Sequence, residues 1–231
     1  MTTVVLFDID GTILLTDGAG RRAVHRALEE VFGMLPPDGH EFDGKTDPQI
    51  VRELMTLAGV SDERIERGLP DAISRYVELL TTELGDADHG DKVYPGVLAL
   101  LDTLEARDDV LLGLLTGNVR DGAMAKLAAV RIDAGRFRVG AFGSDHPARP
   151  ELPAIARARA EEVTGRAVPG ARVVVIGDTP ADMSCGRGIG ARAIGVATGR
   201  YTTDALRACD AFAVFPDLTD TAAVVRAIVG D

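Results

Sequence analysis

Two aspartates stand at the end of an apolar stretch near the start of the chain. The run VVLF (4–7) is followed by Asp8, Ile9, Asp10 and Gly11. A glycine lets the backbone turn without a Cβ clash, so the two acidic side chains can point differently and take separate tasks. Because each carboxylate raises the electrostatic cost of the other, the pair predicts either a protonated carboxyl group or a bound cation.

Two further aspartates, Asp178 and Asp182, lie in the segment GDTPAD (177–182) after another apolar run. If the strands are parallel, this segment meets Asp8 and Asp10 at one edge of the sheet. At an effective dielectric constant of about 20, like charges this close repel by several kcal/mol. Oxygen ligands without histidine or cysteine favour a hard ion, and a site that keeps waters and meets phosphate favours Mg²⁺. We therefore expect these four aspartates to form a magnesium site.

The remaining polar residues at the strand ends suit a phosphate group. Thr116 offers a hydroxyl, and Gly117 leaves backbone N–H groups open to an anion. Asn118 adds an amide near a helix N-terminus, where the helix dipole favours negative charge. Arg149, ahead of another helix, supplies a cation that can neutralise phosphoryl oxygens and aspartates together. The sequence thus predicts a phosphate site beside the acidic cluster.

Alternating strands and helices position these groups. Nearly continuous apolar runs predict strands covered on both faces, at 4–7, 110–116, 172–178, 191–198 and 211–215. Helical spacing is found between them, at 97–107, 119–130, 151–164, 181–188, 202–208 and 218–229. This alternation predicts an α/β fold with a doubly wound parallel sheet, which binds ligands outside the carboxyl ends of its strands.

One segment breaks the alternation, because residues 15–92 carry helical patterns and no convincing strand. Helices are expected at 20–33, 47–60 and 71–84, the second with Asp47 as its cap and Pro48 at its first position. We expect an inserted helical cap domain over 15–92 and a core domain formed by 1–14 and 93–231. Linkers are expected near 13–18 and 85–96.

Composition limits the classes of function. The 231 residues carry a net charge of −11 and a pI of about 4.8, which argues against nucleic acid as a partner. Small anionic substrates stay possible, since a local cation can reverse the sign of a site. The two cysteines, Cys185 and Cys209, have no metal-binding spacing, and no signal peptide or membrane-spanning run is found. A cytoplasmic protein is expected, as a monomer or a homodimer.

The motifs DIDGT, LLTGN and VVVIGDTPAD occur in this order on three expected strands, with a helical insert after the first. In this the sequence resembles the haloacid dehalogenase (HAD) superfamily of phosphohydrolases, in the branch with a C1-type helical cap between the first two motifs. The likeness covers essentially the whole chain and is greatest to phosphoglycolate-phosphatase-like members. The family usually has a lysine in its third motif. Here no lysine follows Lys126, and Arg149 in ARPEL is the nearest equivalent, with a different reach and geometry.

The resemblance implies two-step phosphoryl transfer to water. Asp8 would attack phosphorus and form an aspartyl-phosphate, and Asp10 would protonate the leaving oxygen and then deprotonate the attacking water. Mg²⁺ would be held by Asp8, the backbone carbonyl of Asp10 and Asp178. Asp182 would bind the ion through water or hold Arg149, and is expected behind the direct ligands.

The cap is expected to close over the site and exclude water. Its segment FDGKTDP (42–48) would bring Lys45 or Thr46 to the leaving group of a small phosphorylated metabolite. Arg21 and Arg22, in the first cap helix, are further candidates for a carboxylate or a second anion.

Several functions compete with a phosphatase. A phosphomutase of the β-phosphoglucomutase type uses the same core and aspartates but protects the phosphoenzyme from water. A dehalogenase would use Asp8 without a metal, and the second carboxylate, Asp10, argues against it. A non-catalytic phospho-acceptor module also has clustered aspartates and Mg²⁺, but such modules are about half this length, lack a cap and carry the phosphorylated aspartate on a middle strand.

Overall fold

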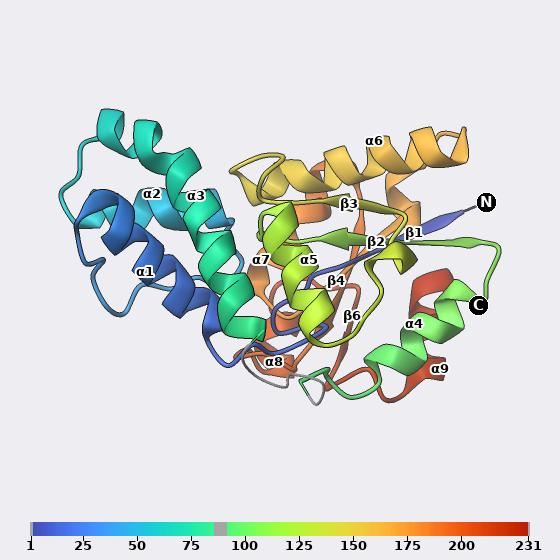
Figure 1. Cartoon of the computed structure of the whole chain (residues 1–231). Helices are drawn as coiled ribbons and strands as arrows, with labels where there is room; N and C mark the ends of the chain where they lie inside the picture. Colours follow the sequence, from blue (N-terminus) through green and yellow to red (C-terminus); the bar gives the residue numbers. More distant parts are fainter. Residues whose placement is uncertain (1, 86–91, 231) are drawn as a thin grey trace.

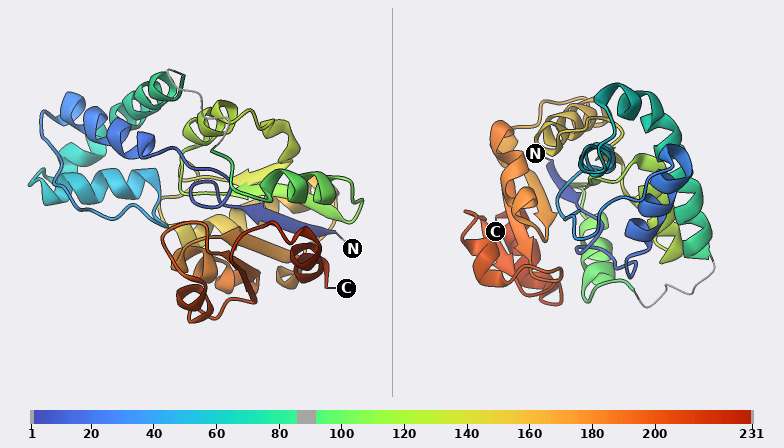
Figure 2. Two further views of the ribbon diagram at one scale, coloured as in Figure 1. Left: turned by 90° about the horizontal axis from the view of Figure 1, so that it is seen from below. Right: turned by 90° about the vertical axis from the view of Figure 1, so that its left-hand side faces the viewer.

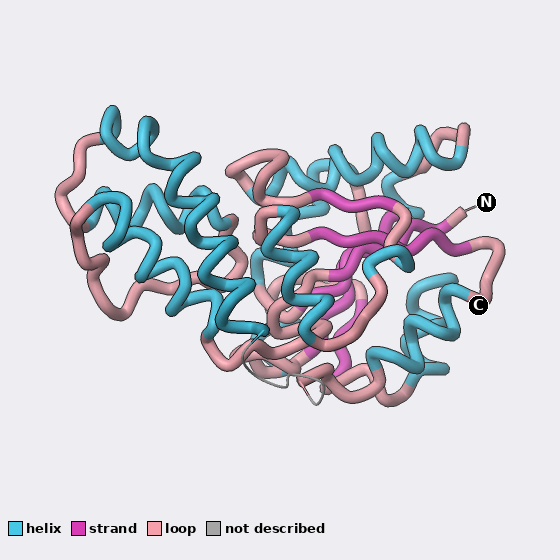
Figure 3. Tube along the Cα trace, in the orientation of Figure 1, coloured by secondary structure: helices cyan, strands magenta, loops and turns pink. Residues whose placement is uncertain are grey.

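A parallel sheet forms the centre of the molecule. The computed structural model describes residues 2–85 and 92–230, and in this part of the chain six parallel strands are ordered β3-β2-β1-β4-β5-β6 (Figures 1 and 3). The strands are β1 (Thr3–Phe7), β2 (Val110–Leu115), β3 (Val139–Ala141), β4 (Val173–Gly177), β5 (Arg192–Val196) and β6 (Ala213–Phe215). The predicted doubly wound α/β fold is confirmed. The short strand β3 was not predicted.

Helices cover both faces of the sheet, which is why its strands are apolar on both sides. Alternate residues of a strand point to opposite faces. Val5 and Phe7 of β1 pack in one cluster with side chains of α4 (Val97–Glu105), α5 (Arg120–Ala129) and α9 (Thr221–Val229). Val4 and Leu6 pack in another with α6 (Leu152–Thr164). The remaining helices of the core are α7 (Pro180–Cys185) and α8 (Thr203–Arg207).

Three helices form a separate body beyond the carboxyl ends of the strands, opposite the N-terminus (Figures 1 and 2). They are α1 (Ala19–Phe32), α2 (Asp47–Leu57) and α3 (Asp62–Gly85), and they share a hydrophobic cluster to which the sheet-bearing part of the chain contributes Val119. Helix α3 begins nine residues before its predicted start at 71 (71 − 62 = 9) and passes through Pro70. Packing against α1 and α2 stabilises this helix by more than the proline destabilises it locally.

The two connections between these helices and the sheet run side by side. Leu14 forms an antiparallel bridge with Val93, and the backbone N–H of Leu15 donates to the carbonyl of Lys92 at 2.9 Å. The division of the chain into a core of 1–14 and 93–231 and a cap of 15–92 stays a prediction. The predicted linker at 85–96 lies partly outside the described residues. None of the helices in the described ranges combines the length and the apolar character that a bilayer crossing requires.

Strand order places the predicted chemistry at one edge. β1 lies between β2 and β4, in parallel register with both. The residues that follow these three strands, at 8–10, 116–118 and 178–182, therefore converge below the cap helices. This is the place where open parallel sheets bind ligands.

Candidate active site

The acidic cluster forms where β1 and β4 end. Asp8, Asp178 and Asp182 are buried, and one oxygen of each lies within 4.8 Å of the others. Gly11 makes this possible. Its φ of 82° lies in the left-handed region, and a Cβ there would stand 2.3 Å from Oδ2 of Asp178. The sharp turn after the first strand therefore brings the β4 aspartate against the β1 aspartate.

The cluster lacks enough positive charge of its own. Burial raises the pKa of Asp8 to about 7, although Arg149 opposes this, and the nearby Asp182 and Asp10 raise it further. Burial, with Asp182 and Asp8, raises the pKa of Asp178 to about 8. Because the ionised forms of both carboxyl groups are destabilised, the site suits a hard divalent cation that binds oxygen ligands, as predicted for Mg²⁺. Asp8 and Asp178 would hold that ion.

Both carboxylate oxygens of Asp182 accept hydrogen bonds from neighbouring residues. Its Oδ1 accepts from Nη2 of Arg149, and its Oδ2 accepts from the hydroxyl of Thr179 at 2.6 Å and from the Thr179 N–H at 3.0 Å. The bond from the Thr179 N–H, together with a bond from the Asp182 N–H to the Thr179 hydroxyl oxygen at 3.2 Å, forms a capping box at the start of α7. The geometry supports Asp182 as the residue that holds Arg149, which was one of its two predicted roles.

Arg149 lies in the short helix Arg149–Glu151 and is buried. Its Nη2 is 3.1 Å from Oδ1 of Asp8. Burial alone would lower the pKa of Arg149, but the carboxylates of Asp182 and Asp8 hold it well above its ordinary value. Its Nε has no hydrogen-bond partner among the described residues. The structure thus places this arginine against the predicted nucleophile, where the family's motif lysine was expected.

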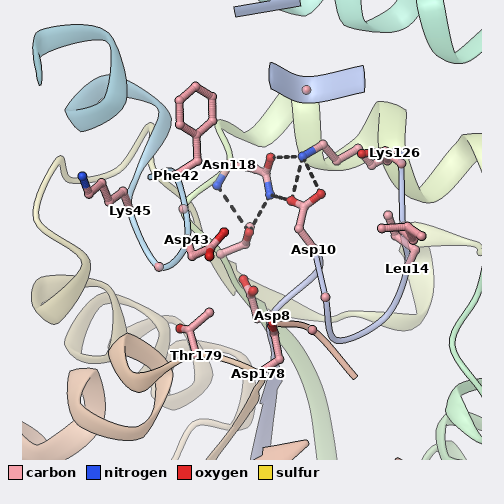
Figure 4. Close-up of a pocket in the computed structure, with 18 of the residues that line it drawn as sticks. Asp8, Asp10, Leu14, Phe42, Asp43, Lys45, Asn118, Lys126, Asp178 and Thr179 are labelled. Carbon is pink, nitrogen blue, oxygen red and sulfur yellow. Dashed lines mark hydrogen bonds and ion pairs between the residues drawn. The ribbon is translucent and has the colours of Figure 1, made fainter. Parts of the chain in front are cut away.

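Asp10 turns away from the other three aspartates, so its side chain is not part of the acidic cluster. The prediction that all four carboxyl groups meet is wrong on this point. Both oxygens of Asp10 accept from Nζ of Lys126, at 2.8 and 2.7 Å, and Oδ2 also accepts from the Asn118 amide at 2.7 Å (Figure 4). The ammonium group of Lys126 attracts the carboxylate to this side. Only the backbone carbonyl of Asp10 remains a candidate ligand.

Lys126 was missed by the sequence reasoning. It lies in α5, it is 4% exposed, and its Nζ also donates to Oδ1 of Asn118 at 2.6 Å. A sequence signal was present, since Gly122 and Lys126 are four residues apart on one face of α5, which begins two residues after Asn118. The family's lysine was expected in the third motif, which follows Lys126 in the chain.

The TGN segment is organised by its own side chains and by the cap. Thr116 is buried, and its hydroxyl oxygen accepts from the Asn118 side-chain amide at 2.8 Å. A Cβ on Gly117 would stand 1.9 Å from the carbonyl oxygen of Lys45. The glycine is therefore required by the approach of the cap segment, whereas the sequence suggested the approach of an anion. Thr116, Gly117 and Asn118 all line the cavity described below.

Asp47 is a second residue whose role was missed. It was predicted to cap α2, but Thr46 takes that position and accepts from the Gln49 N–H at 3.2 Å. The carboxylate of Asp47 instead accepts from the Val119 N–H at 2.7 Å, at the start of α5, and its own N–H donates to the Gly117 carbonyl at 2.8 Å. Burial raises the pKa of Asp47 to about 6. This residue fastens the cap to the TGN segment.

Lys45 and Thr46 make other contacts than those predicted. Nζ of Lys45 donates to Glu53 at 2.6 Å, and although the residue lines the cavity, its ammonium group points away from the aspartates (Figure 4). The hydroxyl of Thr46 donates to the Pro147 carbonyl at 2.7 Å. Thr46 is not among the described residues that line the cavity, so this geometry does not support it as a substrate contact.

The two arginines of α1 differ in position. Arg21 lines the cavity, with its guanidinium carbon 3.9 Å from the centre of the Phe42 ring and its Nη1 donating to the His40 carbonyl at 2.8 Å. Arg22 pairs with Glu83 and is not among the described residues that line the cavity. Arg21 therefore stays a candidate for substrate binding.

A cavity of about 450 Å³ lies between cap and core. The core lines it with Asp8, Asp10, Asp178, Arg149 and Lys126, and the cap lines it with Phe42, Lys45, Asp47, Ile50 and Tyr76. Charged groups line the cavity at the sheet edge, whereas the cap side combines charged groups with apolar and aromatic surface from Phe42, Ile50 and Tyr76. Such a cavity suits a small molecule with an anionic end.

Comparison with protein families identifies the chain. The model of the haloacid dehalogenase-like hydrolases matches residues 5–187, which includes all three strand-end motifs. The chain belongs to this family. A comparison with curated protein sequences finds no significant match.

Several solved structures share the fold of this HAD hydrolase. A hydrolase from Pseudomonas syringae superposes with a TM-score of 0.70 at 22% identity, covering 99% of this chain and 100% of that one. A β-phosphoglucomutase from Clostridium difficile gives 0.72 at 16% identity, with 99% and 97% covered. A predicted phosphoglycolate phosphatase from Haemophilus somnus gives 0.68 at 18% identity, with 97% and 98% covered.

Proposed function

We propose that this HAD hydrolase is a Mg²⁺-dependent phosphatase that hydrolyses a small phosphomonoester through an aspartyl-phosphate. The observation that carries the proposal is the pair formed by Asp8 and Arg149 at the edge of the cavity. A buried carboxylate beside a buried guanidinium supplies a nucleophile and a partner for the phosphoryl oxygens in one place. The bound ion would supply positive charge between the nucleophile and the phosphate.

In the first step, an oxygen of Asp8 attacks phosphorus while the bond from phosphorus to the leaving oxygen breaks. The protonated carboxyl group of Asp10 gives its proton to that oxygen, so the product leaves as an alcohol. Arg149 and Thr116 face the phosphoryl oxygens and stabilise the charge that spreads over them. The Asp8 oxygen stays bonded to phosphorus.

In the second step, the carboxylate of Asp10 takes a proton from water, and the water oxygen attacks phosphorus. The bond between phosphorus and Asp8 breaks, which releases inorganic phosphate and restores the Asp8 carboxylate. Asp10 is then protonated for the next cycle. The cap residues, held by Asp47, keep bulk water from the acyl-phosphate until the alcohol leaves.

The test is a panel of phosphorylated metabolites, incubated with the purified protein and Mg²⁺ and scored by release of inorganic phosphate. We expect turnover of at least one small phosphomonoester, and Asp8→Asn should lower its kcat by about four orders of magnitude or more. If Asp8→Asn retains appreciable activity, the assignment of the nucleophile is wrong.

A phosphomutase is the second candidate, because a β-phosphoglucomutase shares the fold over nearly the whole chain. A single turnover separates the two functions. A phosphatase releases phosphate into solution, whereas a mutase returns the phosphoryl group to the sugar.

A further inference from the structure

Lys126 is a buried cation that the mechanism above does not use. Lysine is seldom buried unless its charge is paired. In this chain the ammonium group of Lys126 donates to both oxygens of Asp10 and to Oδ1 of Asn118, at 2.6 to 2.8 Å. Lys126 belongs to α5, and three acceptor atoms hold its ammonium group.

The same contacts fix Asp10 from two sides. Nδ2 of Asn118 donates to Oδ2 of Asp10 at 2.7 Å and also to the hydroxyl oxygen of Thr116 at 2.8 Å. The chain of contacts therefore runs from Lys126 through Asp10 and Asn118 to Thr116, and Figure 4 shows the contacts among Lys126, Asp10 and Asn118. The side chain of Asp10 remains 43% exposed, toward the cavity that it lines.

We propose that Lys126 is a positioning residue for Asp10, which it holds where a leaving-group oxygen can reach the carboxyl group. The inference rests on the proposed function, since it assumes that Asp10 transfers protons. Without the lysine, the one hydrogen bond left to the Asp10 carboxyl group from the described residues would come from Asn118, and the group could swing toward solvent or toward the other aspartates. A displacement of about 1 Å in a catalytic group can cost about 100-fold in rate.

A matched pair of substrates tests this role. The leaving group of p-nitrophenyl phosphate departs readily as an anion, whereas phenyl phosphate has nearly the same shape and a much more basic leaving oxygen. Loss of a well-placed proton donor therefore slows phenyl phosphate far more than p-nitrophenyl phosphate. The ratio of the two kcat/KM values is measured on one protein sample, so the fraction of folded protein cancels.

We expect Lys126→Met to lower kcat/KM for phenyl phosphate by about 100-fold and that for p-nitrophenyl phosphate by less than about tenfold. Asp10→Asn should change the ratio in the same direction. The double variant should match Asp10→Asn, because the lysine acts only through that aspartate. The control is Arg136→Met, which removes a cation paired with Asp102 and Glu105 outside the cavity and should leave the ratio unchanged.

Other outcomes would overturn the inference, and they separate it from the proposed function. If Asp10→Asn changes the ratio and Lys126→Met does not, the lysine does not position the acid, although the phosphatase proposal stands. If Lys126→Met raises KM equally for both esters with kcat unchanged, the lysine binds substrate. Additive effects in the double variant would also contradict it. If Asp10→Asn leaves the ratio unchanged, the proton-transfer role within the proposed function fails.

Discussion

Arg149 lies with its Nη2 3.1 Å from Oδ1 of Asp8, and both side chains are buried. The same nitrogen contacts Asp182, whose other oxygen is bound to Thr179. Asp182 thus holds the guanidinium group of Arg149 in place beside the carboxylate of Asp8. This arrangement explains how an arginine can stand where the family usually has a lysine.

Two substitutions of Arg149 should distinguish the effect of its positive charge on activity from the effect of its hydrogen-bonding geometry. We expect Arg149→Met to lower kcat for p-nitrophenyl phosphate by about 100- to 1,000-fold, the usual cost of losing one group that stabilises developing negative charge. Arg149→Lys should retain more activity, because it keeps the charge and loses the fork that spans Asp8 and Asp182. Steady-state kinetics of the two variants provide the measurement. An Arg149→Met enzyme within about threefold of wild type would contradict this role.

Gly199 keeps space for the Asp178 carboxylate. A Cβ at this position would stand 1.9 Å from Oδ2 of Asp178, so Gly199→Ala must turn the carboxyl group aside. We expect the Mg²⁺ concentration for half-maximal activity to rise by about tenfold or more, as when support of a metal ligand is lost. Gly188→Ala is the control, since nothing lies within 4 Å of a Cβ there. An equal Mg²⁺ requirement in both variants would show that Asp178 is not a ligand.

Asp47 joins the cap to the helix that follows the TGN segment. Asp47→Ala leaves the buried N–H of Val119 without its acceptor and should lower the free energy of unfolding by about 1 to 3 kcal/mol. Asp47→Asn keeps an acceptor oxygen and should stay close to wild type. Urea denaturation of the two variants measures the difference. Equal stability of Asp47→Ala and Asp47→Asn would exclude this hydrogen bond as the source.

The raised pKa values predict how stability depends on pH without metal. For Asp8, Asp47 and Asp178 the pKa is about 7, 6 and 8 in the folded protein and 3.8 as the ordinary value. The folded state then binds more protons than the unfolded state, so the stabilising contribution is complete below pH 3.8 and is lost as pH rises toward 8.

Mg²⁺ should reverse the part of this loss that comes from Asp8 and Asp178, because it would bind their charged carboxylates and compete with protons. In the presence of a chelator, we expect Tm to fall as pH rises from 5 to about 8, because the stabilising contribution of these three groups is lost. Added Mg²⁺ should raise Tm more at pH 8 than at pH 5. Asp178→Asn provides the control, since it should show a flatter pH dependence and a smaller response to Mg²⁺. Equal stabilisation at both pH values would argue against an ion among these groups.

Much of the fold follows from local pattern. The apolar runs at 4–7, 110–116 and 172–178 are buried strands because helices cover both faces, and continuous apolar sequence is the signature of that environment. The three-residue strand Val139–Ala141 contains Gly140 and carries too little pattern for this reasoning. The predicted start of the third cap helix at 71 was too late, because α3 begins at Asp62 and continues through Pro70, stabilised by its packing against α1 and α2.

The residue types that form the site, and their position after the ends of strands, could be predicted from the sequence. Asp8 and Asp178 meet because β1 and β4 are neighbouring parallel strands, whose carboxyl ends lie at the same edge of the sheet. The direction of the Asp10 side chain depends on Lys126, which lies in α5, eight residues after Asn118. The need for a glycine at position 117 comes from the close approach of the cap segment at Lys45, which lies far away in sequence. Contacts between distant segments are the part that single-sequence reasoning could not supply.

The central claim is that Asp8 carries the phosphoryl group during turnover, and trapping the phosphoenzyme tests it most directly. The protein is mixed with p-nitrophenyl phosphate and Mg²⁺, quenched in acid within one turnover, and digested for mass spectrometry of the peptide that contains Asp8. We predict one phosphoryl group on Asp8 in the wild type, a larger amount in Asp10→Asn, whose second step lacks its base, and none in Asp8→Asn. Turnover without an adduct on Asp8 in Asp10→Asn, or an adduct on another residue, would contradict the account.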